Sequence, residues 1–500
     1  MTIIGRVQGS AKKAFDRIRN EKVKHNLLQA IPFWVASLIT GLVAVLYTRL
    51  FALAEKGTAY IIHTHLWLFF IVTPLCFLTA WWLVRRFAPY ARGSGIPQVM
   101  AAMELATPKH NDKVNKLLSL RIIFIKIVSS LVMAFGGGVI GREGPTIQVA
   151  GSVFRKINEW LPAWWPRISK RNMIMTGAAA GLAAAFNTPL GGIVFAVEEL
   201  TRTHISYFKT ALFTAVIIAG LTAQALLGPY LYLGYPDVSH LSGYIFLCVL
   251  LVAIPAGLAG SLMSRWMLKI FRWKDGFRFT RQHVLYVAGC ALVLASLAFF
   301  INEKVLGSGK ELMTTALFTQ DKYNPWYMPL LRIVGPIFSF TTGASGGVFA
   351  PALSAGASIG ATLSGWMHLS STDTNLLILS GMVAFLTGVT RTPFTSAILV
   401  LEMTDRHNVI FHLMLAGMAA SLVAMLVDKH SFYDHLKYQY MHDLIKEKPV
   451  TPDGPHPGED TGHPAKEDPG YPADPSQEDP GLPADPSQED PDGPHPGEDT

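Results

Sequence analysis

The chain has 500 residues, of which 50% are hydrophobic and only 15% are charged, and its formal net charge is +7. A soluble protein of this length needs more charged surface, so the composition excludes an ordinary water-soluble multidomain protein. Apolar stretches of membrane-spanning length predict instead an all-α polytopic membrane protein, since a β-barrel would show short alternating strands. The clearest stretches are residues 27–54, 60–84, 122–140, 212–233, 244–268, 284–301 and 411–427.

The N-terminal segment, residues 1–29, is basic. Its first 26 residues hold seven lysines and arginines and two acids, and no cleavable signal sequence is evident. Residues 11–19 have the pattern of a basic amphipathic helix that lies on an anionic membrane surface, although a solvated polar helix fits equally. The positive-inside rule predicts cytoplasmic N- and C-termini. Because the positive charge lies beside apolar stretches, it does not indicate nucleic-acid binding.

Three glycine-rich breaks interrupt the apolar sequence at residues 93–97, 136–145 and 343–351, and each ends in a proline followed by a helical pattern. Proline is favoured in the first turn of a helix, and a helix N-terminus exposes unpaired N–H donors and partial positive charge. Several such ends directed at one point make an anion site, and irregular backbone at membrane depth must line a cavity or be buried. We therefore predict an anion-binding cavity; the alternative is that glycine and proline only permit close helix packing.

Two charged residues lie within this apolar region. Glu143 stands between Arg142 and Gly144, where a carboxylate is costly unless it has a function. In an anion site Glu143 would compete with a substrate anion and swing away when protonated; the alternative is a static ion pair with Arg142. Lys126 stands alone in the stretch 122–140 and would supply positive potential or pair with a buried acid, unless its amine snorkels to the interface.

Two adjacent carboxylates, Glu198 and Glu199, end the apolar run 191–197. Neighbouring residues on a helix point about 100° apart, so only one of the two can face a given cavity. We expect the other to cap a helix or to meet a basic loop. One of the pair is a candidate for handling protons from the cytoplasmic side, although plain surface carboxylates fit the sequence too.

The membrane body, residues 30–445, contains an internal repeat that divides it into halves at about 30–235 and 240–445. Identical residues recur at a spacing of 204 positions, and one pair of prolines and one pair of basic residues recur at a spacing of 206 positions. Repeated halves with broken helices are typical of transporters, and the sequence leaves open whether the halves are inverted or parallel. The pairs are Gly177 and Gly381, Ala180 and Ala384, Thr188 and Thr392, Pro189 and Pro393, Glu198 and Glu402, Pro145 and Pro351, and Lys126 and Arg332.

Residues 446–500 have a different composition. From Pro449 to the end there are 14 prolines, 14 acidic residues and a single lysine, which is too little apolar content for a core. We predict a disordered, acidic, proline-rich tail. The three cysteines, Cys76, Cys248 and Cys290, lie in apolar sequence and are expected to be packing residues. No metal site, cofactor or enzyme active site is indicated.

The breaks resemble the signature motifs of the CLC family of chloride channels and chloride/proton exchangers. Gly93–Pro97 is similar to the family's GSGIP, Gly141–Pro145 to GREGP and Gly347–Pro351 to GxFxP, in the same order. The resemblance covers residues 30–445 and implies a CLC-type inverted repeat with about 17–18 helices of uneven length. It also implies a homodimer with one pore per subunit. The family's cytosolic CBS domains are not indicated, which fits a prokaryotic member in a bacterial inner membrane.

The resemblance implies a chloride site built from the hydroxyl groups of Ser94 and Tyr433 and the backbone N–H groups of Val348 and Phe349. Serine rather than proline at position 94 favours chloride over nitrate, and the motifs argue against the fluoride-exporting branch of the family. Supporting residues in or beside the motifs are Gly93, Gly95, Pro97, Gly141, Arg142, Gly144, Pro145, Gly347, Pro351 and Lys126.

The resemblance also implies roles for two glutamates. Glu143 is similar to the gating glutamate that carries the extracellular proton, and Glu199 to the internal proton glutamate. Because channels of the family usually lack the inner glutamate, we expect a chloride/proton antiporter. A passive voltage- or pH-gated chloride channel is the alternative, followed by an anion transporter of a different fold. The expected partners are chloride, protons, the lipid bilayer and a second copy of the chain.

Overall fold

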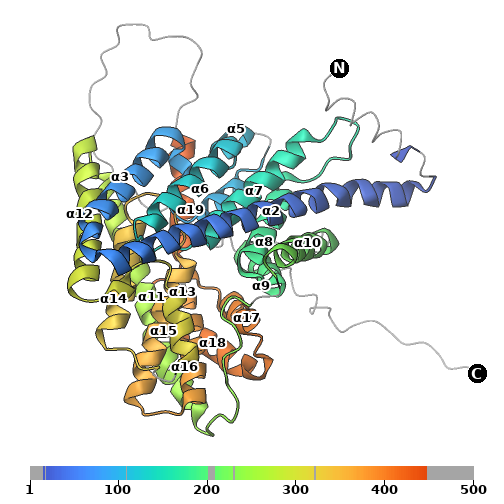
Figure 1. The fold of residues 1–500 in the computed structure, drawn as a ribbon. Coiled ribbons are helices and arrows are strands. Elements are labelled where there is room, and N and C mark those ends of the chain that lie inside the picture. Colours follow the sequence, from blue (N-terminus) through green and yellow to red (C-terminus); the bar gives the residue numbers. More distant parts are fainter. Residues whose placement is uncertain are drawn as a thin grey trace, which may run out of the picture. The chain divides into compact units, whose positions relative to one another are not determined.

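The computed structural model describes residues 15–16, 19–107, 110–200, 209–228, 231–319 and 322–446, and within these ranges the chain is almost entirely helical. The predicted amphipathic helix at 11–19 lies mostly outside them and the acidic tail almost wholly so, and both stay predictions. The helices of the first half are α2 (Glu21–Thr64), α3 (Phe69–Phe87), α4 (Ile96–Glu104), α5 (Asn111–Leu117), α6 (Leu120–Phe135), α7 (Glu143–Trp160), α8 (Lys170–Phe186), α9 (Pro189–Phe195) and α10 (Lys209–Leu227). Those of the second half are α11 (Ile245–Asp275), α12 (Thr280–Phe300), α13 (Lys310–Phe318), α14 (Tyr327–Phe340), α15 (Phe349–Trp366), α16 (Ser371–Thr390), α17 (Pro393–Thr404), α18 (Ile410–Val427) and α19 (Phe432–Lys446) (Figure 1).

The helices are of uneven length, as predicted. Eight of those in the described ranges are long and apolar enough to cross a membrane, whereas α4 has nine residues and α9 has seven. The predicted apolar stretch 60–84 is not a single helix, because α2 ends at Thr64 and a short 3-10 turn (Leu66–Leu68) precedes α3. At its other end, α2 begins at Glu21 and runs through the predicted boundary near residue 30.

Corresponding helices recur in the two halves. The helices α7 and α15 each have 18 residues and begin 206 positions apart, at Glu143 and Phe349. The nine-residue helices α4 and α13 begin 214 positions apart, at Ile96 and Lys310. The internal repeat of the sequence is therefore a repeat of structure, with equal helix lengths in these two pairs, whereas α9 has seven residues and its counterpart α17 has twelve.

A reciprocal pair of contacts joins the halves where α9 lies beside α17 (Figure 1). The carboxylate of Glu402, on α17, accepts hydrogen bonds from the backbone N–H groups of the second and third residues of α9, at 3.0 and 2.6 Å. The carboxylate of Glu198 accepts the equivalent bonds from the second and third residues of α17, at 3.1 and 2.6 Å. Each half thus makes the same contact with the other half. Reciprocal contacts of this kind are those of two units related by a twofold axis.

The two halves are inverted, because corresponding breaks face opposite ends of the molecule. The segment Gly93–Gly95 before α4 and the segment Gly307–Gly309 before α13 have the same left-handed glycines, with φ of 64° and 109° in the first and 69° and 87° in the second. The C-terminal end of α3 and the segment Gly93–Ser94 line one cavity, whereas the segment Gly307–Gly309 and the C-terminal part of α2, which leads into α3, line another. A helix of 19 residues is about 28 Å long, so the cavities lie on opposite membrane faces.

Candidate functional site

The three glycine-rich breaks, which are far apart in the sequence, meet in the structure. Gly141 and Gly347 exchange two backbone hydrogen bonds of 2.8 and 2.7 Å. The N–H of Gly93 donates to the carbonyl of Ala344 at 2.8 Å, and the N–H of Gly346 donates back to the carbonyl of Gly93 at 3.1 Å. The starts of α4, α7 and α15 are thereby held around one point, which is the convergence that the sequence predicts.

Glycine is needed at two positions in this region because side chains approach the backbone closely. A Cβ atom on Gly144 would collide with the hydroxyl oxygen of Ser94, and a Cβ atom on Gly141 would collide with the carboxylate of Glu143. Gly95, at the N-cap of α4, has a φ of 109°, which other residues rarely adopt. The motif glycines therefore allow the polar groups to reach the helix ends.

Two hydroxyl groups, those of Ser94 and Tyr433, lie in the centre and are near enough to each other to interact. Ser94 and Tyr433 are each 1% exposed, and neither hydroxyl oxygen has a hydrogen-bond partner within the described residues. Buried polar groups are normally paired, so these two hydroxyl groups are available to bind a ligand or a water molecule. Burial raises the pKa of the Tyr433 hydroxyl above its usual range, so it is a neutral donor. Its ring stacks on Phe349, with centroids 6.3 Å apart and planes inclined by 10°.

The predicted backbone donors lie at the start of α15. Val348 is the N-cap of this helix and Phe349 its first residue, and both are buried. N–H groups in the first turn of a helix have no partner inside that helix. Because the ring of Phe349 stacks on Tyr433, the start of α15 lies beside the tyrosine that the sequence assigns to the same site.

Glu143 is the first residue of α7 and is 1% exposed. Its Oε2 atom has no hydrogen-bond partner within the described residues. Arg142 and Lys310 are near enough to favour its negative charge, and Glu55 is near enough to oppose it. Arg142 also donates a hydrogen bond of 3.2 Å to the carbonyl of Thr48, on α2. The carboxylate is thus buried among the helix ends, in a region with charges of both signs.

Lys126 is fully buried, which contradicts the alternative that its amine snorkels to the interface. The amine donates hydrogen bonds to the carbonyls of Ala91 and Gly93, at 3.0 and 2.7 Å. These carbonyls belong to the chain that leads into the first break. Arg332, the counterpart of Lys126, donates in the same way to the carbonyls of residues 304–307, which lead into the Gly307–Gly309 segment. Each basic side chain therefore binds backbone carbonyl oxygens at the start of a break and holds that part of the backbone in place.

The structure separates the roles of the adjacent glutamates. Glu198 caps α17, as described above, so it is the carboxylate that the sequence expects at a helix end. Both residues lie in a π-helical segment (Ala196–Leu200), in which the side-chain directions differ from those of an α-helix. Glu199 and Glu143 are both close enough to Tyr433 to act on its hydroxyl electrostatically. Glu199 therefore remains the candidate for proton handling.

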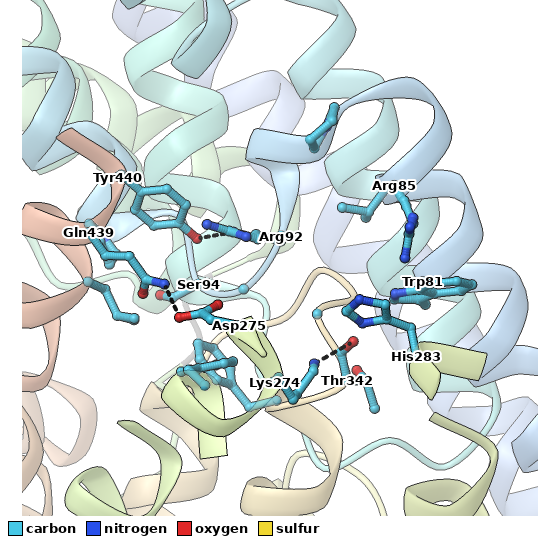
Figure 2. A pocket seen from close by; sticks show the side chains of 18 residues that line it. Trp81, Arg85, Arg92, Ser94, Lys274, Asp275, His283, Thr342, Gln439 and Tyr440 are labelled. Atoms are coloured by element: carbon cyan, nitrogen blue, oxygen red, sulfur yellow. Dashed lines mark hydrogen bonds between the residues drawn. The ribbon is translucent and has the colours of Figure 1, made fainter. Parts of the chain in front are cut away.

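A cavity of about 290 Å³ leads to Ser94 from one face of the molecule (Figure 2). Its lining includes Arg85, Arg92 and Lys274, with a single carboxylate, Asp275. The guanidinium of Arg92 donates to the hydroxyl of Tyr440 at 3.3 Å and lies 3.2 Å from the carboxylate of Asp443. These basic residues were not predicted from the sequence, where the only available signal was the position of Arg92 directly before Gly93. Their excess of positive charge attracts anions towards Ser94.

The second cavity, of about 480 Å³, opens on the opposite face. Glu55, Lys310 and Ser308 contribute to its lining. The hydroxyl of Ser308, the counterpart of Ser94, donates to the carboxylate of Glu55 at 2.6 Å. The two faces thus differ: the hydroxyl of Ser94 has no hydrogen-bond partner within the described residues, whereas that of Ser308 is bonded to a carboxylate. Glu55 was not predicted from the sequence as a site residue.

Comparisons with known proteins agree with this architecture. Residues 75–425 match the family model described as voltage gated chloride channel. The H(+)/Cl(-) exchange transporter ClcA of Cronobacter sakazakii is 29% identical over 471 residues, which are 90% of this chain and 97% of that protein. The ClcA protein of Salmonella schwarzengrund is 29% identical over 444 residues, which cover 84% and 90% of the two chains.

Two solved structures have the same fold. A slow cyanobacterial Cl-/H+ antiporter superimposes with a TM-score of 0.73 at 23% identity, covering 84% of this chain and 99% of that one. A eukaryotic CLC transporter gives a TM-score of 0.65 at 19% identity, covering 82% of this chain and 74% of that one. The family model spans most of the membrane body and the fold is that of CLC transporters, so this chain belongs to the CLC family of voltage-gated chloride channels and chloride/proton exchangers.

Proposed function

We propose that this protein is a chloride/proton antiporter, which moves chloride across a membrane in exchange for protons. The observation that supports it most is the burial of the Glu143 carboxylate at converging helix N-termini, in a site with two unpaired hydroxyl groups. A competing anion that can be protonated links anion movement to proton movement. The names of the ClcA relatives, which are H(+)/Cl(-) exchange transporters, agree with this proposal.

In this proposal a dehydrated chloride ion lies between the hydroxyl groups of Ser94 and Tyr433 and the N–H groups of Val348 and Phe349. Each donor replaces part of the ion's hydration shell, and the positive ends of the helices favour its charge. No full positive charge needs to touch the ion, because Lys126 is bonded to carbonyl oxygens. An ion held by dipoles alone can leave as well as bind, which transport requires.

Glu143 would couple the two ions by occupying the anion path in its charged form. Protonation from the outer cavity neutralises the carboxylate, which then leaves the path, and chloride takes its place. The proton continues to the inner side by way of Glu199, and the ionised Glu143 returns to displace chloride outward. Both glutamates act electrostatically on Tyr433, so a charge change at either one is felt in the anion site.

We place the cavity that leads to Ser94, together with both chain termini, on the cytoplasmic side of a bacterial inner membrane. Its basic lining would collect chloride from the cytoplasm, and the cavity with Glu55 would face outward. We further propose that two copies assemble in the bilayer as a homodimer, with one pore in each. Cross-linking of the purified protein in lipid would yield a dimer, and a purely monomeric species would contradict this assembly.

The proposal is tested by proton uptake into liposomes that contain the purified protein, with a chloride gradient as the sole driving force. We expect protons to move against their own gradient and Glu199→Gln to stop this movement while chloride flux continues. A matched control is Glu104→Gln, an exposed carboxylate at the end of α4, which should transport both ions normally. If chloride moves and protons do not in the unaltered protein, it is a passive chloride channel, and Glu199 has no role in coupling.

A further inference from the structure

Three potential metal ligands meet in the short connection between α18 and α19. Asp428 follows the last residue of α18, His430 lies two positions further on, and His435 is in the first turns of α19. One ligand atom from each residue, two imidazole nitrogens and a carboxylate oxygen, lies within 4.8 Å of the other two. None of the three takes part in the proposed exchange of chloride and protons.

The distances within this cluster are close to those of a metal site. The Nε2 atom of His435 lies 2.9 Å from Oδ2 of Asp428. Two ligands of one tetrahedral zinc ion, each about 2.1 Å from the metal, are about 3.4 Å apart, so this pair needs only a small shift. The ring centroids of His430 and His435 are 5.7 Å apart, and the two ring planes are inclined by 72°. Since His430 is exposed, its ring can turn towards the pair.

The backbone beneath these ligands is held by other groups. The guanidinium of Arg391 donates to the carbonyl of Asp428 from Nε and Nη2, at 3.2 Å each. Ser431 and Asp434 exchange two hydrogen bonds of 3.0 Å and fix the first turn of α19. The N–H of His430 donates to the second carboxylate oxygen of Asp428 at 2.9 Å, which orients this carboxylate. Supporting hydrogen bonds of this kind increase the affinity of a metal site.

We propose that Asp428, His430 and His435 bind a divalent transition-metal ion of the zinc class. Two imidazoles and one carboxylate suit Zn²⁺, Ni²⁺ or Cu²⁺, whereas Ca²⁺ and Mg²⁺ prefer sites made of oxygen atoms. The ion takes the place of the proton between His435 Nε2 and Asp428 Oδ2, and His430 supplies the third ligand. Water completes the coordination, because three protein ligands leave a position open.

The bound ion would tie the end of α18 to the start of α19. Tyr433 is two residues before His435 on the same helix, and its hydroxyl is part of the proposed chloride site. A metal that restrains this turn therefore also restrains Tyr433 at the proposed chloride site, so zinc bound here reduces chloride transport. This consequence rests on the proposed function, whereas metal binding itself does not.

Binding is tested by titrating Zn²⁺ into the purified full-length protein in detergent, followed by calorimetry. We expect His430→Ala and His435→Ala each to weaken one binding event per chain by about tenfold or more. His442→Ala, an exposed histidine further along α19, is the matched control and should leave that event unchanged. Since the tail contains His456, His463 and His495, only the difference between variants is interpreted. Equal zinc binding by the unaltered protein and both cluster variants would overturn the site.

The restraint is tested by backbone hydrogen exchange and by chloride efflux from liposomes. Zinc should slow exchange in residues 428–437 and reduce chloride flux at least threefold in the unaltered protein, with neither effect in His430→Ala. The exposed His430 side chain can be removed without loss of folding, so this variant separates metal binding from stability. Zinc binding that leaves exchange and flux unchanged would refute the restraint. A protein that binds zinc but moves no protons would contradict only the proposed antiport.

Discussion

Replacing Tyr433 by phenylalanine removes one hydroxyl group from the proposed chloride site and keeps the ring. The ring is stacked on Phe349, so packing is preserved. The hydroxyl makes no hydrogen bond of normal geometry among the described residues, and the only side-chain hydroxyl near enough to act on it is that of Ser94, so its removal breaks no established internal hydrogen bond. What is lost is the bond to the anion. A hydrogen bond to a charged group contributes about 1.5–3 kcal/mol, which corresponds to about a 10- to 150-fold weaker chloride affinity.

The assay for Tyr433→Phe is calorimetric titration of chloride into purified protein in chloride-free buffer, together with thermal unfolding. Without chloride the variant should be as stable as the unaltered protein or more stable, because a buried unpaired hydroxyl costs about 1–3 kcal/mol. With saturating chloride the unaltered protein should gain more stability than the variant. A chloride dissociation constant within twofold of the original would refute the assignment of Tyr433 to the site.

Five further substitutions test other parts of the structure. Glu143→Ala should abolish proton coupling and leave chloride flux in the liposome assay; retained coupling would contradict the gating role. Glu55→Gln removes a negative charge that favours protonation of Glu143, so half-maximal transport should shift to a more acidic external pH, and an unchanged pH profile would refute this influence. Lys126→Met leaves two buried carbonyls unpaired and should lower the free energy of unfolding by about 2 kcal/mol or more, measured by thermal unfolding. Glu198→Gln and Glu402→Gln should each destabilise by about 1 kcal/mol, since each carboxylate accepts two backbone N–H groups at the start of a helix, and Glu198→Gln should cost more because Glu198 also accepts from the hydroxyl of Thr395 at 2.7 Å; equal losses would show that this extra bond does not contribute.

The inverted repeat has a consequence for how the site works. The same backbone design occurs twice, with a basic residue bonded to the carbonyls before each break. On one face the serine of the break is unpaired within the described residues, and on the other the equivalent Ser308 donates to Glu55. The difference between the faces therefore comes from a few side chains placed on a symmetric frame, not from two different backbones.

The positions of the helix starts and the correspondence of the two halves could be predicted from the sequence alone. Glycine at left-handed positions and proline in the first turn act locally, so the breaks before α4, α7 and α15 could be predicted from neighbouring residues alone. The spacing of 204 residues between Glu198 and Glu402 likewise needs no coordinates. The predicted apolar stretches did not include α16. Its small and polar residues lower its hydropathy, although the helix is almost fully buried in the structure.

Which buried groups contact one another depends on how distant helices pack, and this could not be predicted from the sequence. Sequence could not tell which of Glu198 and Glu199 caps a helix, because the N–H groups that Glu198 accepts from are about 200 residues away. The carbonyl partners of Lys126 and the basic cavity around Arg92 and Lys274 also depend on helices brought together by packing. Local rules fix the backbone of each segment, whereas the pairing of buried charges is set by contacts between distant segments, which no single stretch of sequence encodes.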